Sequence, residues 1–221
     1  MKTTMRIALV LFVAAAASAG EPVVRGGVPV DSLTPAGMQR LSMVAPTAVG
    51  RPVRLTFGSA DRPEVLIDVL VAPDASTARA ALDDWLRTVV NRPGPEALGD
   101  VGYGEGTLFG FVRDNVLVAV HKVAGEADAA AIAAQADAAV QAAPAGETQA
   151  AGVPEQRFDD EQLGQVPQPI VFPSGWIAAN VSVCGPGYAR HTAGGWVVVR
   201  DGPGVVTVRV TGVDDRLRST T

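Results

Sequence analysis

Two of the few side chains in this sequence that are suited to nucleophilic chemistry lie close together in its last quarter. Cys184 is the single cysteine, and His191, one of two histidines, follows seven residues later. A cysteine and a histidine can act as nucleophile and base when they are within hydrogen-bond reach and a third group orients the base. Asp201 or Asp214 can supply that group, although no family signature surrounds the pair. An enzyme of an unrecognised class centred on Cys184 and His191 is therefore one alternative.

Cys184 also has a structural interpretation, which we prefer. It lies between Val181-Ser182-Val183 and Gly185-Pro186-Gly187, at the expected end of a strand. Cysteine behaves there as a small apolar residue. A single thiol cannot form an internal disulfide, so an intermolecular disulfide or a reactive thiol stays open as the alternative. His121 lies in an alternating apolar run beside Lys122 and is expected to be a solvated or half-buried strand residue.

The acidic and glycine-rich segments do not form a recognisable ligand site. Asp159-Asp160-Glu161 and Asp214-Asp215 lack the Asp-x-Asp-x-Asp-Gly loop that binds calcium, and the histidines and cysteine are too dispersed for zinc. Gly102-Tyr103-Gly104-Glu105-Gly106 precedes an expected hairpin, whereas a dinucleotide loop joins a strand to a helix. We predict solvated turns at the acidic segments, a strand turn or bulge at the glycines, and neither a metal nor another cofactor.

Aromatic and hydrogen-bonding side chains concentrate at one place, in a glycine-rich segment that is predicted to be a loop. They are Tyr188, Arg190, His191 and Trp196. Such side chains are typical of contact surfaces, so one hypothesis is that they bind a protein or glycan partner of the cell envelope. The alternative, which the pattern favours, is a loop whose Trp196 is tucked into the core.

The first residues have the three parts of a secretory signal peptide. Met1-Lys2-Thr3-Thr4-Met5-Arg6 is a short basic start, residues 7–17 are apolar, and Ala17-Ser18-Ala19 supplies small side chains for signal peptidase. A membrane anchor needs about 20 apolar residues, and Gly20-Glu21-Pro22 ends this run earlier. We predict a signal peptide over residues 1–19, cleavage after Ala19, a periplasmic or secreted protein, and no membrane span after cleavage.

The charge of the chain excludes one class of partner. The formal net charge is −5, and the first 19 residues carry Lys2 and Arg6 and no acid, so removing them changes it to −7. No cluster of Lys or Arg occurs along the chain. Nucleic acid requires a basic patch, so we predict no nucleic-acid partner.

Hydrophobic periodicity predicts an α+β domain over residues 20–142. Apolar spacing of three and four residues predicts helices over residues 74–90 and 126–142, and a weaker pattern starting with Thr34 and Pro35 predicts one over residues 31–44. Alternation predicts strands, and these cover residues 53–57, 64–71, 107–112 and 116–123. Arg113-Asp114-Asn115 predicts a tight hairpin between the last two. The expected fold is an antiparallel sheet with packed helices.

This order of elements resembles a group of uncharacterised secreted bacterial domains. The resemblance covers about residues 45–142 and includes Leu98-Gly99-Asp100-Val101-Gly102-Tyr103, a Gly-Asp, small residue, aromatic step that precedes the hairpin. The group has no agreed activity. The resemblance therefore implies an α+β fold and no chemistry.

Residues 143–154 are low in bulky apolar side chains and predict a linker, after which the sequence changes character. Residues 155–221 contain no convincing helix, and they predict strands over residues 169–172, 176–183, 195–200, 204–213 and 217–220. The segment from Pro203 to Asp215 is similar to the closing strands of bacterial immunoglobulin-like modules. A complete sandwich of that kind has about 100 residues, so we expect either an abbreviated sandwich or a β-extension packed on the first domain.

Together, these patterns favour a non-catalytic, exported binding or accessory protein of the bacterial envelope. The enzyme centred on Cys184 and His191 and a structural component of the cell envelope are the alternatives. If the protein is such a binding or accessory protein, no residue is assigned a catalytic role.

Overall fold

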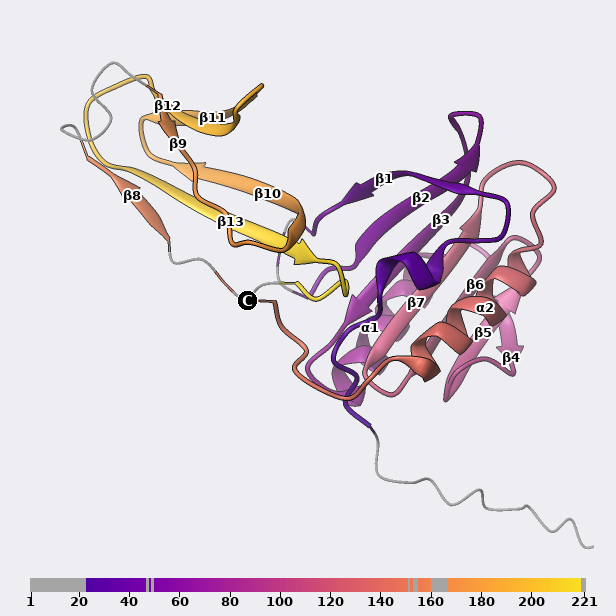
Figure 1. Cartoon of the computed structure of the whole chain (residues 1–221). Helices are drawn as coiled ribbons and strands as arrows, with labels where there is room; N and C mark the ends of the chain where they lie inside the picture. Colours follow the sequence, from indigo (N-terminus) through magenta and orange to yellow (C-terminus); the bar gives the residue numbers. More distant parts are fainter. Residues whose placement is uncertain are drawn as a thin grey trace, which may run out of the picture.

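The computed structural model describes residues 23–46, 48, 50–150, 152, 155–159 and 167–219 (Figure 1). The predicted signal peptide and its cleavage point after Ala19 lie outside the described residues, so export stays a prediction. Among the described residues, no helix combines the length and the apolar character that crossing a bilayer requires.

A seven-stranded antiparallel sheet forms the first part of the described chain (Figure 1). Its strands are β1 (Gln39–Val44), β2 (Val53–Ser59), β3 (Arg62–Val71), β4 (Gly94–Glu96), β5 (Val101–Glu105), β6 (Leu108–Arg113) and β7 (Val116–Lys122). The helices are the 3-10 helix η1 (Val30–Leu33), α1 (Ala75–Thr88) and α2 (Ala129–Ala142). The spatial order of the strands is β1-β2-β3-β7-β6-β5-β4, so the β6–β7 hairpin returns to the centre of the sheet beside β3.

The two α-helices of the described chain lie on opposite faces of this sheet. Helix α2 and η1 pack on the face that carries Val69 and Val118, and α1 packs on the face that carries Leu70 and Leu117. Successive strand residues point to opposite faces, so β3 and β7 contribute to both cores. This explains why β7 is apolar along almost its whole length.

Aspartate side chains cap both helices. The Asp74 carboxylate accepts hydrogen bonds from the Ser76 hydroxyl at 2.6 Å and from the Thr77 N–H at 2.8 Å. These two hydrogen bonds, that of Ser76 first, lower the pKa of Asp74. Asp128 accepts from the N–H groups of Ala130 and Ala131, so α2 begins at Ala129 rather than near residue 126. Such caps satisfy N–H groups that the first helical turn leaves without partners.

Residues 39–44 form strand β1, so the helix predicted over residues 31–44 is wrong. Only the single turn η1 is helical, and Gly37 follows with φ +75°, a conformation that is incompatible with a right-handed helix. Leu41 and Met43 are half-buried between exposed neighbours, which is a period of two. The edge of β2 supplies the backbone partners, with Met43 opposite Leu55. Pairing with a distant strand therefore outweighs a weak local helical pattern.

The second part of the described chain is all β. Its strands are β8 (Gln156–Phe158), β9 (Gln168–Pro169), β10 (Trp176–Cys184), β11 (Gly187–Thr192), β12 (Gly195–Arg200) and β13 (Val206–Asp214). They form two three-stranded antiparallel sheets, β10-β13-β8 and β11-β12-β9. A small core with Ile170, Val198 and Val208 lies between them. The structure thus confirms an α+β part followed by an all-β part, which we call the β-rich module.

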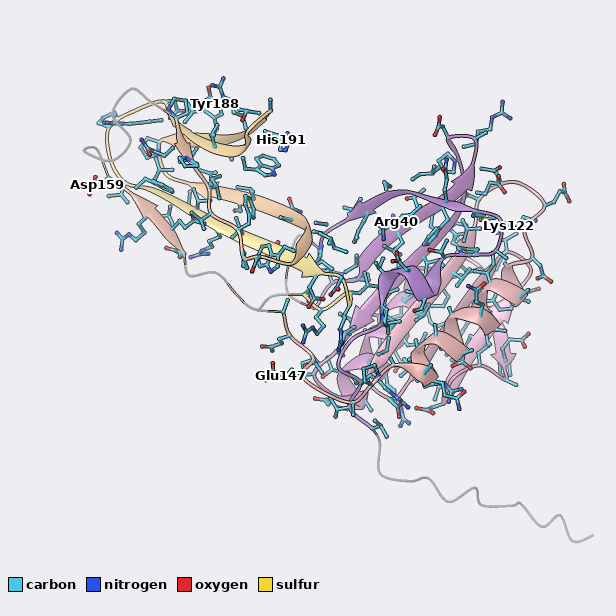
Figure 2. The ribbon with its side chains drawn as sticks, in the orientation of Figure 1. Arg40, Lys122, Glu147, Asp159, Tyr188 and His191 are labelled. Atoms are coloured by element: carbon cyan, nitrogen blue, oxygen red, sulfur yellow. The ribbon has the colours of Figure 1, made fainter. Side chains whose placement is uncertain are left out.

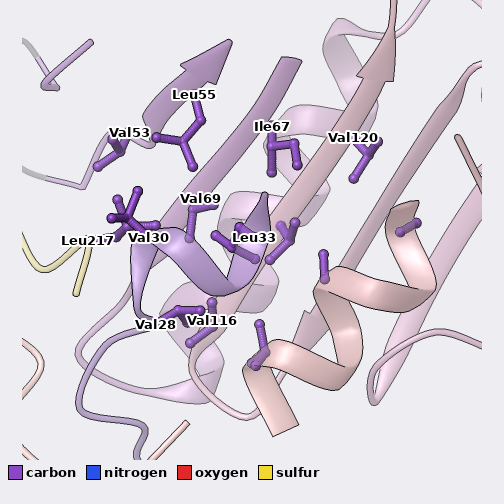
Figure 3. Close-up of a cluster of buried hydrophobic side chains, with 14 of the residues drawn as sticks. Val28, Val30, Leu33, Val53, Leu55, Ile67, Val69, Val116, Val120 and Leu217 are labelled. Atoms are coloured by element: carbon purple, nitrogen blue, oxygen red, sulfur yellow. The ribbon is translucent and has the colours of Figure 1, made fainter. Parts of the chain in front are cut away.

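The last described residues return to the first domain. Leu217 is 1% exposed and lies in the same buried cluster as Val28, Val30 and Leu55 (Figure 3). Val28 N–H donates to the Arg216 carbonyl at 2.8 Å, and Val30 N–H donates to the Asp215 carbonyl at 2.9 Å. Residues 215–216 form a turn, and the described residues 217–219 make one isolated bridge, from Ser219 to Val213, rather than the strand predicted there.

The segment predicted as a linker, residues 143–154, contacts the start of the described chain. Gly26 N–H donates to the Pro144 carbonyl, and Gly146 N–H donates to the Val24 carbonyl. Ala143 is buried. These contacts fix the described part of the segment against the first domain, and the domain boundaries at residues 142, 154 and 155 stay predictions.

Candidate functional site

The four residues predicted as a contact surface lie on one hairpin of the β-rich module, formed by β11 and β12. Figure 2 shows Tyr188 and His191 on this hairpin, away from the helices of the first domain. Tyr188 is opposite Val199, and His191 is opposite Trp196. Residues directly opposite share a face, and neighbours along a strand point to different faces. Tyr188 and Arg190 therefore lie on one face of the hairpin, and His191 and Trp196 lie on the other.

The segment that holds three of these residues is a strand, so the loop predicted around residues 187–192 is wrong. β11 pairs with β12 along its full length, from Gly187 opposite Arg200 to Thr192 opposite Gly195. The hydroxyl of Thr192 donates to the Gly195 carbonyl at 2.8 Å, and Gly195 has φ +106°. Because this turn is compact, the chain passes directly from β11 into β12, and the segment with the polar side chains is a strand of the sheet.

An open apolar hollow of about 280 Å³ lies on the Trp196 face of the hairpin. Its lining residues carry no charge and include two tryptophans; they are Phe172, Trp176, Ile177, Ala178, Ala179 and Trp196. The His191 ring meets the Trp196 ring edge-on, with centroids 5.5 Å apart. Phe172 and Trp176 make a second edge-on pair at 6.3 Å. Both separations are within the range of favourable aromatic pairs.

Packing fixes the rings that line this hollow. The Trp176 ring lies directly over Gly212 of β13, where any Cβ would collide with it. A register shift between Trp176 and Ala178 turns the start of β10 at this point. Ile177, beside them, is 44% exposed. The hollow thus combines rigid, half-buried indole rings with an exposed aliphatic side chain.

The opposite face of the hairpin is a second, flatter surface. Tyr188 is 47% exposed and Arg190 is exposed, and the half-buried Val197 and Val199 lie across from them on the same face. The geometry therefore divides the predicted surface into two candidates that can be tested separately.

Cys184 and His191 are not joined in this structure. Cys184 is exposed at the end of β10, opposite Thr207, and shares that face with Arg209. His191 is four residues along β11 and contacts Trp196. No hydrogen bond links the thiol to the imidazole among the residues that the structure describes, and a nucleophile and its base require one.

The Gly-Asp step before the β6–β7 hairpin has a structural role. The Asp100 carboxylate accepts from the Asp114 N–H at 2.7 Å, at a turn where Asp114 has φ +54°. Gly99, with φ +58°, donates its N–H to Asp137 of α2 at 3.1 Å. The guanidinium of Arg113 binds both carboxylate oxygens of Asp137. These contacts fasten the hairpin turn to helix α2.

Asp137 has a pKa below its ordinary value because of this arrangement. Burial is the largest influence and would raise the pKa, but the hydrogen bonds from Arg113 and from the Gly99 N–H, with the positive charge of Arg113, outweigh it. The carboxylate is therefore charged and structural at neutral pH.

The remaining sequence candidates lie apart from one another. His121 is an exposed residue of β7. Of the glycine-rich segment, residues 102–105 belong to strand β5, and Gly106 lies in the turn that follows, where the sequence predicted a strand turn or bulge. Asp214 is 7% exposed, in contrast to the solvated turn predicted; it pairs with Arg218 at 2.7 Å and accepts two N–H groups of the final turn. Asp160 and Glu161 lie outside the described residues. Within the described ranges, no group of three or more His, Cys, Asp or Glu residues is arranged to hold a metal ion.

Comparison with family models, with curated proteins and with solved structures finds no match for this chain.

Of the six residues that line the aromatic hollow, sequence reasoning singled out only Trp196; it missed Phe172, Trp176, Ile177, Ala178 and Ala179. They are distant from Trp196 in sequence and meet it only because the two sheets of the module face each other.

Proposed function

We propose that this chain is an exported, non-catalytic binding or accessory protein of the bacterial envelope. Its contact surface in this proposal is the aromatic hollow of the β-rich module, with His191 at the edge. The observation that carries the proposal is the pair of packed indole rings, Trp176 and Trp196, that line an open and uncharged hollow. Rigid aromatic side chains provide large contact area at small entropic cost, so they dominate many recognition surfaces.

The chemistry of the hollow favours an uncharged group as its occupant. The apolar face of a sugar ring or an apolar side chain of a protein can stack on the indoles, and the His191 imidazole can donate or accept a hydrogen bond. The partner in this proposal is therefore an envelope glycan or an envelope protein. Export by a cleaved signal peptide and an immunoglobulin-like class for the module belong to the same proposal.

The two faces of the hairpin provide a matched test. A hollow variant carries His191→Ala and Ile177→Asp, and a control variant carries Tyr188→Ala and Arg190→Ala on the opposite face. All four side chains are exposed, so both variants should keep the fold. We expect the purified protein, immobilised and incubated with its own envelope extract, to retain a partner, and the hollow variant to lose it.

The readout distinguishes the outcomes. Retention that survives protease treatment of the extract but not glycan digestion identifies a glycan, and the reverse identifies a protein. If the control variant loses the partner while the hollow variant keeps it, the contact surface is the Tyr188 face and the assignment of the hollow is wrong. Retention of nothing specific by the wild-type protein contradicts the proposed function itself.

A further inference from the structure

A second hollow, of about 210 Å³, lies on the first domain between α1 and the neighbouring strands. Helix α1 packs over β6 and β7, so the side of the helix that faces β3 leaves a space above the sheet. The floor consists of Leu70, Leu117 and Ala119, and Trp85 forms a wall. This site is separate from the aromatic hollow of the β-rich module and shares no lining residue with it.

Trp85 is held in place yet keeps part of its ring exposed. A Cβ at Gly110 of β6 would collide with the Trp85 ring, so the glycine provides the space that the ring occupies. The side chain is half-buried and borders this hollow on one side and a further hollow beside His121 on the other. An indole fixed by packing, with one surface open to a hollow, is suited to stacking on a flat ring.

The charges that line the hollow are unequally compensated. Asp68 receives two hydrogen bonds of 2.7 Å from the Arg54 guanidinium, and Asp84 pairs with Arg87 at 2.7 Å. Arg51 also lines the hollow, and among the residues that the structure describes it has no ion pair and no side-chain hydrogen bond. The site therefore presents one uncompensated positive charge beside an apolar floor and an indole ring.

We propose that this hollow binds a small aromatic monocarboxylate, with the carboxylate on Arg51 and the ring between Trp85 and Leu70. A guanidinium matches the two oxygens of a carboxylate with two parallel hydrogen bonds. The two lining carboxylates disfavour a second negative charge, which selects a single acid group. Sites for drug-sized ligands are roughly 300–1,000 Å³. This hollow is smaller, about 210 Å³, so it suits a ligand whose apolar part is about one ring.

The test follows the indole N–H signal of Trp85 by nuclear magnetic resonance during titration of the purified protein. A Trp85→Phe variant assigns the signal. The probes are phenylacetate, its neutral analogue phenylacetamide, and the cation phenethylammonium. We expect saturable shifts with phenylacetate and at least tenfold weaker binding of the other two probes, because only the acid can pair with Arg51.

Three variants complete the design. Arg51→Gln should weaken phenylacetate binding at least tenfold, and Ala81→Met, which fills the hollow without changing charge, should also weaken it. Arg79→Gln makes the same charge change at an exposed position of α1 outside the hollow and should bind as the wild type does. The proposal is overturned if phenylacetate causes no saturable Trp85 shift up to about 10 mM, if the three probes bind equally, or if Arg51→Gln binds as tightly as Arg79→Gln.

Discussion

Asp137 is the residue at which helix α2 and the β6–β7 hairpin are joined, and its protonation should control part of the stability. Asp137→Asn leaves the partly buried Arg113 without its ionic partner, and we expect a loss of roughly 1–3 kcal/mol in the free energy of unfolding at pH 7. Urea unfolding measures this directly. Because the folded pKa lies below the ordinary 3.8, the contribution is complete above about pH 4 and is lost as the pH falls through the folded value.

The wild-type protein should therefore lose its advantage over Asp137→Asn as the pH falls below about 4. Asp83→Asn serves as the control, since Asp83 is exposed on α1 and its replacement should change stability by less than about 0.5 kcal/mol. An advantage over Asp137→Asn that is constant from pH 7 to pH 2 would show that the ion pair is not the cause.

At the scale of elements, the contact between α1 and the sheet depends on the glycine beneath Trp85. Gly110→Val introduces a side chain into space that the Trp85 ring already fills, so α1 must move away from β6. Overpacking of this kind costs about 1–3 kcal/mol. The near-ultraviolet circular dichroism of the tryptophans should change together with the urea midpoint.

Gly94→Val in β4 is the matched control, because it makes the same change where a Cβ meets no atom within 4 Å. We expect it to leave both the spectrum and the midpoint close to those of the wild type. Equal effects of the two replacements would mean that backbone entropy, rather than the Trp85 contact, determines the response.

The elements that local patterns predicted correctly are those whose pattern is strong and self-contained. Helix α1 has its cap at Asp74 and a clear apolar stripe, and the β6–β7 hairpin has a turn sequence between two apolar runs. Strand β1 was missed because Leu41 and Met43 fit two periods and only the edge of β2 decides between them. Strand β11 was missed because its exposed polar residues resemble a loop. Both misses depend on pairing with a partner strand, which no short window of sequence contains.

The candidate site was predictable only in part, for the same reason. Trp196 and His191 were singled out as neighbours in sequence, and their rings do meet. Tyr188 and Arg190 point away from them, because alternation along β11 assigns the pairs to different faces. Trp176 joins Trp196 because the two sheets face each other. In the same way Trp85 of α1 and Arg51, which precedes β2, line one hollow although they are distant in sequence. Residues that are distant in sequence meet at these places only because of the topology of the fold, so no local sequence pattern predicts them.

For the whole molecule, Leu217 connects the β-rich module to the first domain. Its backbone has φ +58°, and the Asp214 carboxylate accepts the N–H groups of Arg216 and Arg218 on either side of it. Leu217→Ala should destabilise the protein by about 2–5 kcal/mol. The loss should include faster hydrogen exchange in β2 of the first domain, because the Leu217 side chain lies in the same buried cluster as Val53 and Leu55.

Val205→Ala is the control within the same module. Val205 is exposed, so its truncation should cost less than about 0.5 kcal/mol and leave exchange in β2 unchanged. If Leu217→Ala speeds exchange only in β10 to β13, the two parts of the chain are not coupled through this residue.

The place of Leu217 in the core of the first domain also has a consequence for the order in which the protein acquires its structure. A polypeptide leaves the ribosome from its N-terminus, so Leu55 emerges long before Leu217, which belongs to the same buried cluster. Contacts between segments so distant in sequence also form slowly, because a long loop must close first. A nascent chain of this sequence therefore completes the core of its first domain only after nearly all of the β-rich module has been synthesised.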